Sequence, residues 1–156
     1  RLKRVKDVFV FCALTGLSYQ RVSTLCPSHL FRDDEGTLWI CRTRAGGGEA
    51  GDNYISRVPL LKPAMVLLEK YRGWNPMNPE GPCFPVPSVQ KMNEYLKEVA
   101  VRCRISKRLT TQMARNTFAA TVTLANRIPK EHVREMLGYS SDYMLRHYMQ
   151  AQERNL

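Results

Sequence analysis

Apolar residues that recur every three or four positions constrain the fold of this chain more than any other feature of its sequence. Near the start, Leu2, Val5, Val8, Phe9 and Cys12 keep this spacing up to a Thr-Gly pair, which is typical of a helix end. Similar patterns and helix-starting residues predict further helices at residues 19–25, from 63, from 88, from 110, at 129–137 and at 142–149. The chain is therefore predicted to be mainly helical.

A short β element is predicted within the first half of the chain. The segments "TLWICRTR" and "NYISRVPL" are rich in β-branched and aromatic residues, and a glycine-rich tip separates them. This arrangement is typical of a long hairpin. The later stretch "GWNPMNPEGPCFPVP" is predicted to be a surface loop because its prolines exclude regular structure. The sequence thus predicts one domain of the α+β class, mainly α with a small β-hairpin or sheet.

The helix predicted from Ser88 is amphipathic, with its apolar residues on one stripe. The stripe consists of Val89, Met92, Tyr95, Leu96, Val99 and Cys103.

The charge of the chain indicates its class of partner. There are 24 Lys and Arg residues against 14 Asp and Glu residues, a formal net charge of +10. Such an excess favours a nucleic-acid partner over an anionic membrane surface. No stretch approaches the roughly 18 apolar residues of a membrane span. The five cysteines are scattered and odd in number, which argues against a disulfide framework or a zinc site and is typical of a reducing cytosol.

The stretch "QMARNTFAA" places an arginine in an otherwise apolar helix. Gln112, Arg115 and Asn116 are spaced three and four apart and share one helix face. The apolar residues of the same helix line another face: Ala114, Phe118, Val122 and Ala125. On this pattern alone, Arg115 is either a solvated surface charge or a residue held in place to meet an anion, and a solvated polar face is the more common case.

Residues 110–150 resemble the second half of the catalytic domain of tyrosine recombinases of the phage-integrase family. That family carries the motif H-x-x-R-H-T-F-A-T, a helix that ends in L-G-H, and a tyrosine nine positions after the last histidine. Here Arg115 is the motif arginine, and Tyr148 lies nine positions after Tyr139. Upstream, "FCALTGLSYQRVSTL" resembles the family's T-G-x-R segment, and the predicted hairpin resembles the family's hairpin. The segments "TGLSYQRV" and "MARNTFAATVTL" are most similar to those of integrases of conjugative transposons.

The resemblance implies a reaction on DNA. Tyr148 would attack a phosphodiester and form a 3′-phosphotyrosine, while Arg115 and a second arginine would hold the non-bridging oxygens. A hairpin lysine would protonate the leaving oxygen, and no metal or cofactor would be needed. The implied partners are double-stranded DNA and other protomers in a higher-order assembly, with no membrane and no small-molecule substrate.

The resemblance also implies a domain organisation and a setting. Residues 1–156 would form the single C-terminal catalytic domain of a longer recombinase whose N-terminal core-binding domain lies outside this chain. The setting would be a DNA-associated protein of the bacterial cytoplasm, encoded by a mobile element.

Several family active-site positions carry other residues in this chain: Ser18, Gly46, Gln112, Asn116 and Tyr139. Ser18 replaces the first arginine, and Gly46 lies about where the hairpin lysine is expected. Amide side chains donate hydrogen bonds but do not transfer protons, and loss of the acid should slow cleavage by roughly two to four decades. Two main hypotheses follow: an active recombinase, or a catalytically degenerate homologue that binds DNA without cutting it. A third, an unrelated basic interaction domain, has less support.

Other basic residues are candidates for DNA contact: Arg42, Arg44, Lys107, Arg108 and Arg146. For Lys107 and Arg108 the alternative is a merely solvated link. Arg21, one helical turn after Ser18, is interpreted as a solvated charge. His29 and His132 lack partners at useful spacing and are predicted to be structural or exposed.

Overall fold

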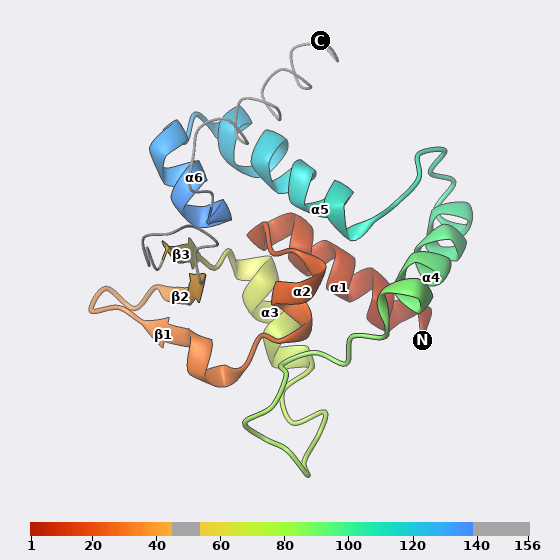
Figure 1. The fold of residues 1–156 in the computed structure, drawn as a ribbon, viewed down its shortest axis with the longest axis horizontal. Helices are drawn as coiled ribbons and strands as arrows, with labels where there is room; N and C mark the ends of the chain where they lie inside the picture. The colour runs from red at the N-terminus through yellow and green to blue at the C-terminus, as the bar shows by residue number, and fades with distance from the viewer. Residues whose placement is uncertain (45–53, 139–156) are drawn as a thin grey trace, which may run out of the picture.

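The computed structural model describes residues 1–44 and 54–138, and its centre is the first helix, α1 (Leu2–Thr15). Figure 1 shows α1 in the middle of the molecule, with other helices on several sides. It packs against α3 (Lys62–Lys70), α4 (Val89–Arg102) and α5 (Thr111–Thr117). The larger core lies around α1 and includes Phe11 and Phe84, whose ring centroids are 4.6 Å apart. The predicted first helix is confirmed.

The helix ends follow the expected chemistry. Gly16 ends α1 in the left-handed conformation, with φ of 74°. The Ser88 and Thr110 side chains accept hydrogen bonds from backbone N–H groups in the first turns of α4 and α5, as predicted. In the predicted stripe of α4, Met92, Leu96 and Val99 are buried, whereas Val89 is 46% exposed and Cys103 is exposed because they lie at the two ends of the helix.

A short helix and a small sheet follow α1 in the chain. Helix α2 (Tyr19–Ser23) and a 3₁₀ turn, η1 (Pro27–His29), lead into strands β1 (Leu30–Arg32), β2 (Leu38–Arg44) and β3 (Tyr54–Pro59). The strands are antiparallel in the order β1-β2-β3. The predicted hairpin is confirmed as β2 and β3. Strand β1 adds a third strand that the sequence did not predict, since three residues are too few for a periodic pattern.

The helix that carries Arg115 changes its pitch. After α5 the chain continues as a π-helical segment, η2 (Phe118–Thr123), and a 3₁₀ turn, η3 (Leu124–Asn126). Along the apolar face predicted for this helix, Ala114 and Phe118 are buried and Val122 is half-buried against the residues around Phe118, whereas Ala125, which lies beyond the wider turn, is exposed.

Helix α6 (Lys130–Leu137) packs on β3 and on η2, as Figure 1 shows for the blue helix above the sheet. It ends at Gly138 in the left-handed conformation, with φ of 69°, as predicted for a Gly stop. A second, smaller core lies between these elements and consists of Val58, Phe118, Ala119, Val133 and Leu137. The described residues therefore form two apolar cores, and α5 and η2 run from one to the other. This is the predicted α+β class.

In the part of the chain that the structure describes, no helix combines the length and hydropathy needed to cross a bilayer.

Candidate functional site

Arg115 lies buried where the ends of α1 and α6 meet. Its Nη1 donates a hydrogen bond to the Gly16 carbonyl oxygen at 2.6 Å, and its Nη2 donates to the Leu137 carbonyl oxygen at 2.7 Å. The side chain is only 8% exposed. The alternative of a solvated surface charge is therefore wrong for this residue.

The partners of Arg115 explain why a charge is stable at this buried position. Both carbonyls belong to helix C-termini, where carbonyl groups lack partners within the helix and carry partial negative charge. The guanidinium group satisfies one carbonyl on each helix and complements both helix dipoles. Arg115 thus connects α1 to α6, and its guanidinium group has the planar, forked geometry of an anion-binding group.

The Thr-Gly turn after α1 brings η2 close to this site. A Cβ atom added at Gly16 would lie 2.5 Å from Phe118 Cδ1 and 2.9 Å from Leu137 Cδ2. Real side chains do not approach so closely, so this turn requires glycine both for its φ angle and for space. Gly16 therefore allows Phe118 to pack directly on the end of α1, beside the carbonyl that Arg115 holds.

Cys12, one turn before Gly16, is not a candidate nucleophile. Burial raises the pKa of the Cys12 thiol to about 12, and the nearby charge of Arg115 opposes this shift only in part. The thiol therefore stays protonated at neutral pH and serves as a core residue.

Arg21 approaches the same site from α2. A Cβ atom added at Gly138 would lie 3.2 Å from Arg21 Nη2 and 3.3 Å from Ser56 Cβ, so the Arg21 guanidinium packs against this turn. The side chain is half-buried, and its interpretation as a solvated charge is wrong. A signal for it existed in the sequence, because Arg21 lies one helical turn after the altered position Ser18 in a helix that follows the Thr-Gly turn directly.

Two further side chains fix the surroundings of the Gly138 turn. Ser56 on β3 donates from Oγ to the Met136 carbonyl at 2.7 Å and so attaches the sheet to the end of α6. Arg42 on β2 donates from Nη1 to the Arg21 carbonyl at 2.5 Å and from Nη2 to Thr24 Oγ1 at 3.0 Å. These bonds hold α2 against the sheet. The predicted contact of Arg42 with DNA stays a prediction.

The altered family positions make local hydrogen bonds. Ser18 Oγ accepts from the Arg21 backbone N–H at 3.4 Å and so caps α2. Gln112 Nε2 donates to Asn116 Oδ1 at 3.0 Å across one turn of α5, with Gln112 exposed and Arg115 turned inward. The structure thus joins Gln112 to Asn116 on the outer side of α5.

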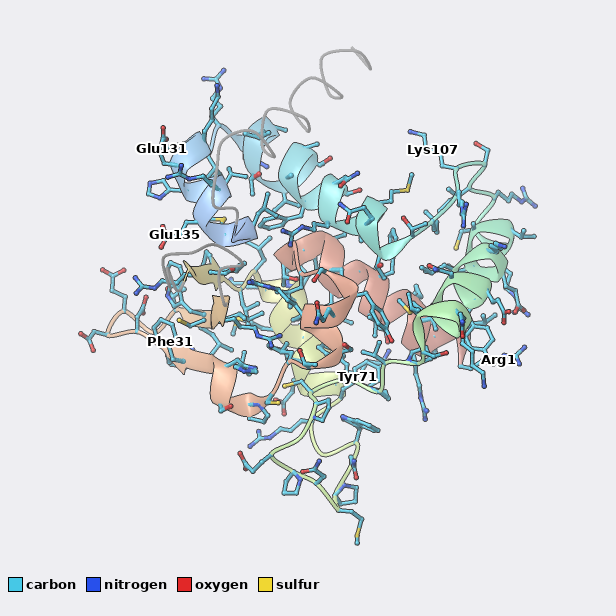
Figure 2. All side chains as sticks on the ribbon, viewed as in Figure 1. Arg1, Phe31, Tyr71, Lys107, Glu131 and Glu135 are labelled. Carbon is cyan, nitrogen blue, oxygen red and sulfur yellow. The ribbon has the colours of Figure 1, made fainter. Side chains whose placement is uncertain are left out.

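Lys107 and Arg108 are exposed in the loop between α4 and α5, where Figure 2 labels Lys107. His29 is structural, as predicted, because its Nδ1 accepts from the Cys26 backbone N–H at 3.0 Å, and His132 is exposed. The remaining predicted site residues lie outside the described part of the chain: Gly46, Tyr139, Arg146 and Tyr148. The side chain of Arg44 also lies outside it.

A metal site and an apolar groove are the two other kinds of site on which the described residues bear. Within residues 1–44 and 54–138, no group of three His, Cys, Asp or Glu side chains lies close enough to hold a metal ion. A surface groove of about 830 Å³ lies between α3, β1 and the proline-rich loop, and its lining includes Leu30, Met65 and Trp74. It does not include Arg115 or Arg21, so it is separate from the arginine site.

Comparisons with known proteins bear on the fold. No protein-family model and no curated protein matches the sequence. Among solved structures, the chain is similar to the XerH site-specific recombinase bound to its difH substrate, with a TM-score of 0.69 at 15% identity over 97% of this chain and 44% of that one. It is also similar to XerA recombinase, with a TM-score of 0.69 at 17% identity over 98% of this chain and 61% of that one.

A third similar structure is the Tn1549 transposon integrase in complex with transposon right end DNA. Its TM-score is 0.69 at 12% identity, over 98% of this chain and 57% of the integrase chain. The chain therefore spans only about half the length of these proteins, and identities this low establish the fold alone. Residues 1–44 and 54–138 have the fold of the catalytic domain of tyrosine recombinases.

Proposed function

We propose that this chain is a DNA-binding strand-transfer domain of a site-specific recombinase. The observation that carries the proposal is the convergence on Arg115 of three segments that are distant in the sequence. The Thr-Gly turn after α1, the T-F-A segment that begins at Thr117 and the Leu-Gly turn after α6 all meet at or beside this side chain. These are the segments on which the resemblance to tyrosine recombinases rests.

The charge of the chain supports DNA as the partner. The net charge of +10 is suited to a polyanion, and Lys107 and Arg108 are exposed. XerH and the Tn1549 integrase, which share the fold, were solved in complex with DNA. We infer that duplex DNA lies across the arginine site, and that a second domain of the full-length protein completes the contact.

The proposed reaction is an in-line displacement at phosphorus. The phenolic oxygen of Tyr148 forms a bond to the phosphorus atom, and the bond between phosphorus and the 5′-oxygen breaks. The phenol loses a proton and the leaving 5′-oxygen gains one, so a 3′-phosphotyrosine and a 5′-hydroxyl are formed. Attack by another strand's 5′-hydroxyl reverses these changes and rejoins the DNA. Arg115 would stabilise the charge that builds on the non-bridging oxygens.

A second candidate function is DNA binding without cleavage. It is favoured by the hydrogen bonds of Arg115 to two helix ends, because these bonds give the residue a structural role that does not depend on catalysis. It is also favoured by the local hydrogen bonds of Ser18, Gln112 and Asn116. In this case the domain would keep its fold and its basic surface but would leave the phosphodiester intact.

A nicked suicide substrate separates the two functions. When the nick lies next to the cleaved phosphate, the short 5′-hydroxyl fragment diffuses away and leaves the protein covalently attached to the DNA. The full-length protein on its own attachment site is expected to form this adduct, and Tyr148→Phe is expected to abolish it. Tyr143→Phe is the matched control and should retain the adduct. If the wild-type protein binds the site and forms no adduct, the second candidate is correct.

A further inference from the structure

We propose that Arg21 and Arg115 together form one phosphodiester-binding site, in which Arg21 supplies the second cation that Ser18 lacks. This inference rests on the proposed DNA-binding function. It assigns a binding role to a residue that lies outside the sequence motif. The ligand class is a single phosphodiester of duplex DNA, which carries one negative charge and two non-bridging oxygens.

The two guanidinium groups meet at the same peptide unit. Arg115 Nη2 donates to the Leu137 carbonyl at 2.7 Å, and the terminal nitrogens of Arg21 lie 3.2 Å and 3.4 Å from the position of a Cβ atom on Gly138. By standard bond lengths the two groups are therefore within about 10 Å of one another. Side chains from α2 and α5 thus converge on a turn that has no side chain of its own.

The surroundings hold Arg21 in this position. The Ser18 cap fixes the first turn of α2, and Arg42 donates to the carbonyl of Arg21 itself. Arg42 brings a third positive charge to the same region from β2. Because α2 is bonded to the sheet and the sheet is bonded to α6 through Ser56, the two arginines are positioned by the fold rather than by long flexible loops.

Electrostatics favour an anion at this place. Like charges at this separation repel one another, and the repulsion is stronger beside a buried group than in water. A phosphodiester between the two arginines would remove the repulsion and accept charge-assisted hydrogen bonds from both planar forks. A lysine would not replace either arginine fully, because an ammonium group lacks the forked geometry.

The first test is the salt dependence of DNA binding by the 156-residue chain, with a short mixed-sequence duplex as the probe. Arg21→Gln is expected to weaken binding several-fold at low salt and to reduce the slope of log K against log salt by about 0.9, the value for one phosphate contact. Arg72→Gln is the matched control, since it removes the same charge from an exposed position after α3 and should leave the slope unchanged. Thermal unfolding followed by circular dichroism checks that both variants are folded.

The second test asks whether the two arginines share one phosphate. Arg21→Gln, Arg115→Lys and the double variant form a double-mutant cycle for DNA affinity. A shared phosphate predicts that the double variant loses less affinity than the two single losses combined. If Arg115→Lys fails to fold, the slope measured for Arg21→Gln still decides whether Arg21 contacts a phosphate.

The outcomes distinguish this inference from the proposed function. A wild-type chain that binds DNA, with an Arg21→Gln slope equal to that of Arg72→Gln, would overturn the role of Arg21 and leave the DNA-binding function intact. Additive losses in the cycle would overturn the shared phosphate. A wild-type chain that fails to bind DNA at low salt would overturn the proposed function and this inference together.

Discussion

Asp7 is a carboxylate that α1 buries almost completely, at 1% exposure, on the side of the helix that faces α3. Lys70 Nζ donates to its Oδ2 at 2.5 Å, the Tyr71 hydroxyl donates to the same oxygen at 2.6 Å, and Lys6 lies 3.0 Å from Oδ1. Burial alone would raise the pKa of Asp7, but these donors outweigh burial and lower it. The pKa of Tyr71 is raised by burial and by its bond to Asp7.

Asp7→Asn is expected to lower the free energy of unfolding by about 2 kcal/mol near neutral pH, because a charge-assisted hydrogen-bond network is lost. Since the folded pKa of Asp7 is lowered, its contribution is present above the unfolded pKa of about 3.9 and is lost as pH falls through the folded pKa. The wild type should therefore lose stability relative to Asp7→Asn below about pH 4. Urea unfolding at several pH values measures both effects.

Glu80→Gln is the control for Asp7→Asn because it changes an exposed carboxylate in the proline-rich loop. It should leave the free energy of unfolding within about 0.5 kcal/mol of the wild type. Equal effects of the two substitutions would contradict the importance of the buried network.

At the scale of single residues, the sequence identified Arg115 but not its environment. The motif letters singled out the side chain, whereas its hydrogen-bond partners are backbone carbonyls 99 and 22 positions away. Backbone carbonyls have no sequence signature, so no pattern around residue 115 could reveal that the guanidinium joins two helix ends. The same holds for Arg21, whose neighbour Gly138 is found only once α6 is placed on the sheet.

At the scale of elements, the sequence predicted whichever helices had clear caps and periodic apolar residues. It failed where the pitch changes or where an element is very short. The π-helical segment η2 follows α5 without a Gly or Pro that would signal a change of pitch, and Ala125, which lies beyond it, is exposed. Strand β1 depends on its pairing with β2, which is a tertiary property. A search for regular helix or strand periodicity detects neither feature.

The close contact between α1 and η2 leads to a prediction about two glycines. Gly16 and Gly73 both have left-handed backbones, with φ of 74° and 70°, but only Gly16 is crowded, by Phe118 and Leu137. Gly73→Ala should lower the free energy of unfolding by about 1 kcal/mol through backbone strain alone. Gly16→Ala should lower it by about 3 kcal/mol, because overpacking adds to the strain.

Chemical denaturation of the two glycine variants side by side measures this difference. Equal losses would mean that η2 does not pack on the end of α1 as described.

At the scale of the whole molecule, the excess of positive charge gives a prediction about the exposed loop between α4 and α5. If Lys107 and Arg108 contact phosphates, the double variant Lys107→Gln/Arg108→Gln should reduce the slope of log K against log salt by about 2, with similar effects on all DNA sequences. The matched control is Lys62→Gln/Arg72→Gln, which removes two charges from exposed positions in and after α3. Fluorescence anisotropy with a labelled duplex measures both slopes, and equal slopes for the two pairs would favour a solvated loop.

The bonds from Arg115 to Gly16 and Leu137 have a consequence for judging which molecules of this kind are still active. Truncation of that side chain removes a tertiary connection together with a positive charge, so an inactive truncated protein could simply be a misfolded one. A relative that had lost every reacting group would still need the arginine to keep its architecture. The presence of Arg115 is therefore a poor indicator of catalytic activity, and the presence or loss of the tyrosine hydroxyl is more informative.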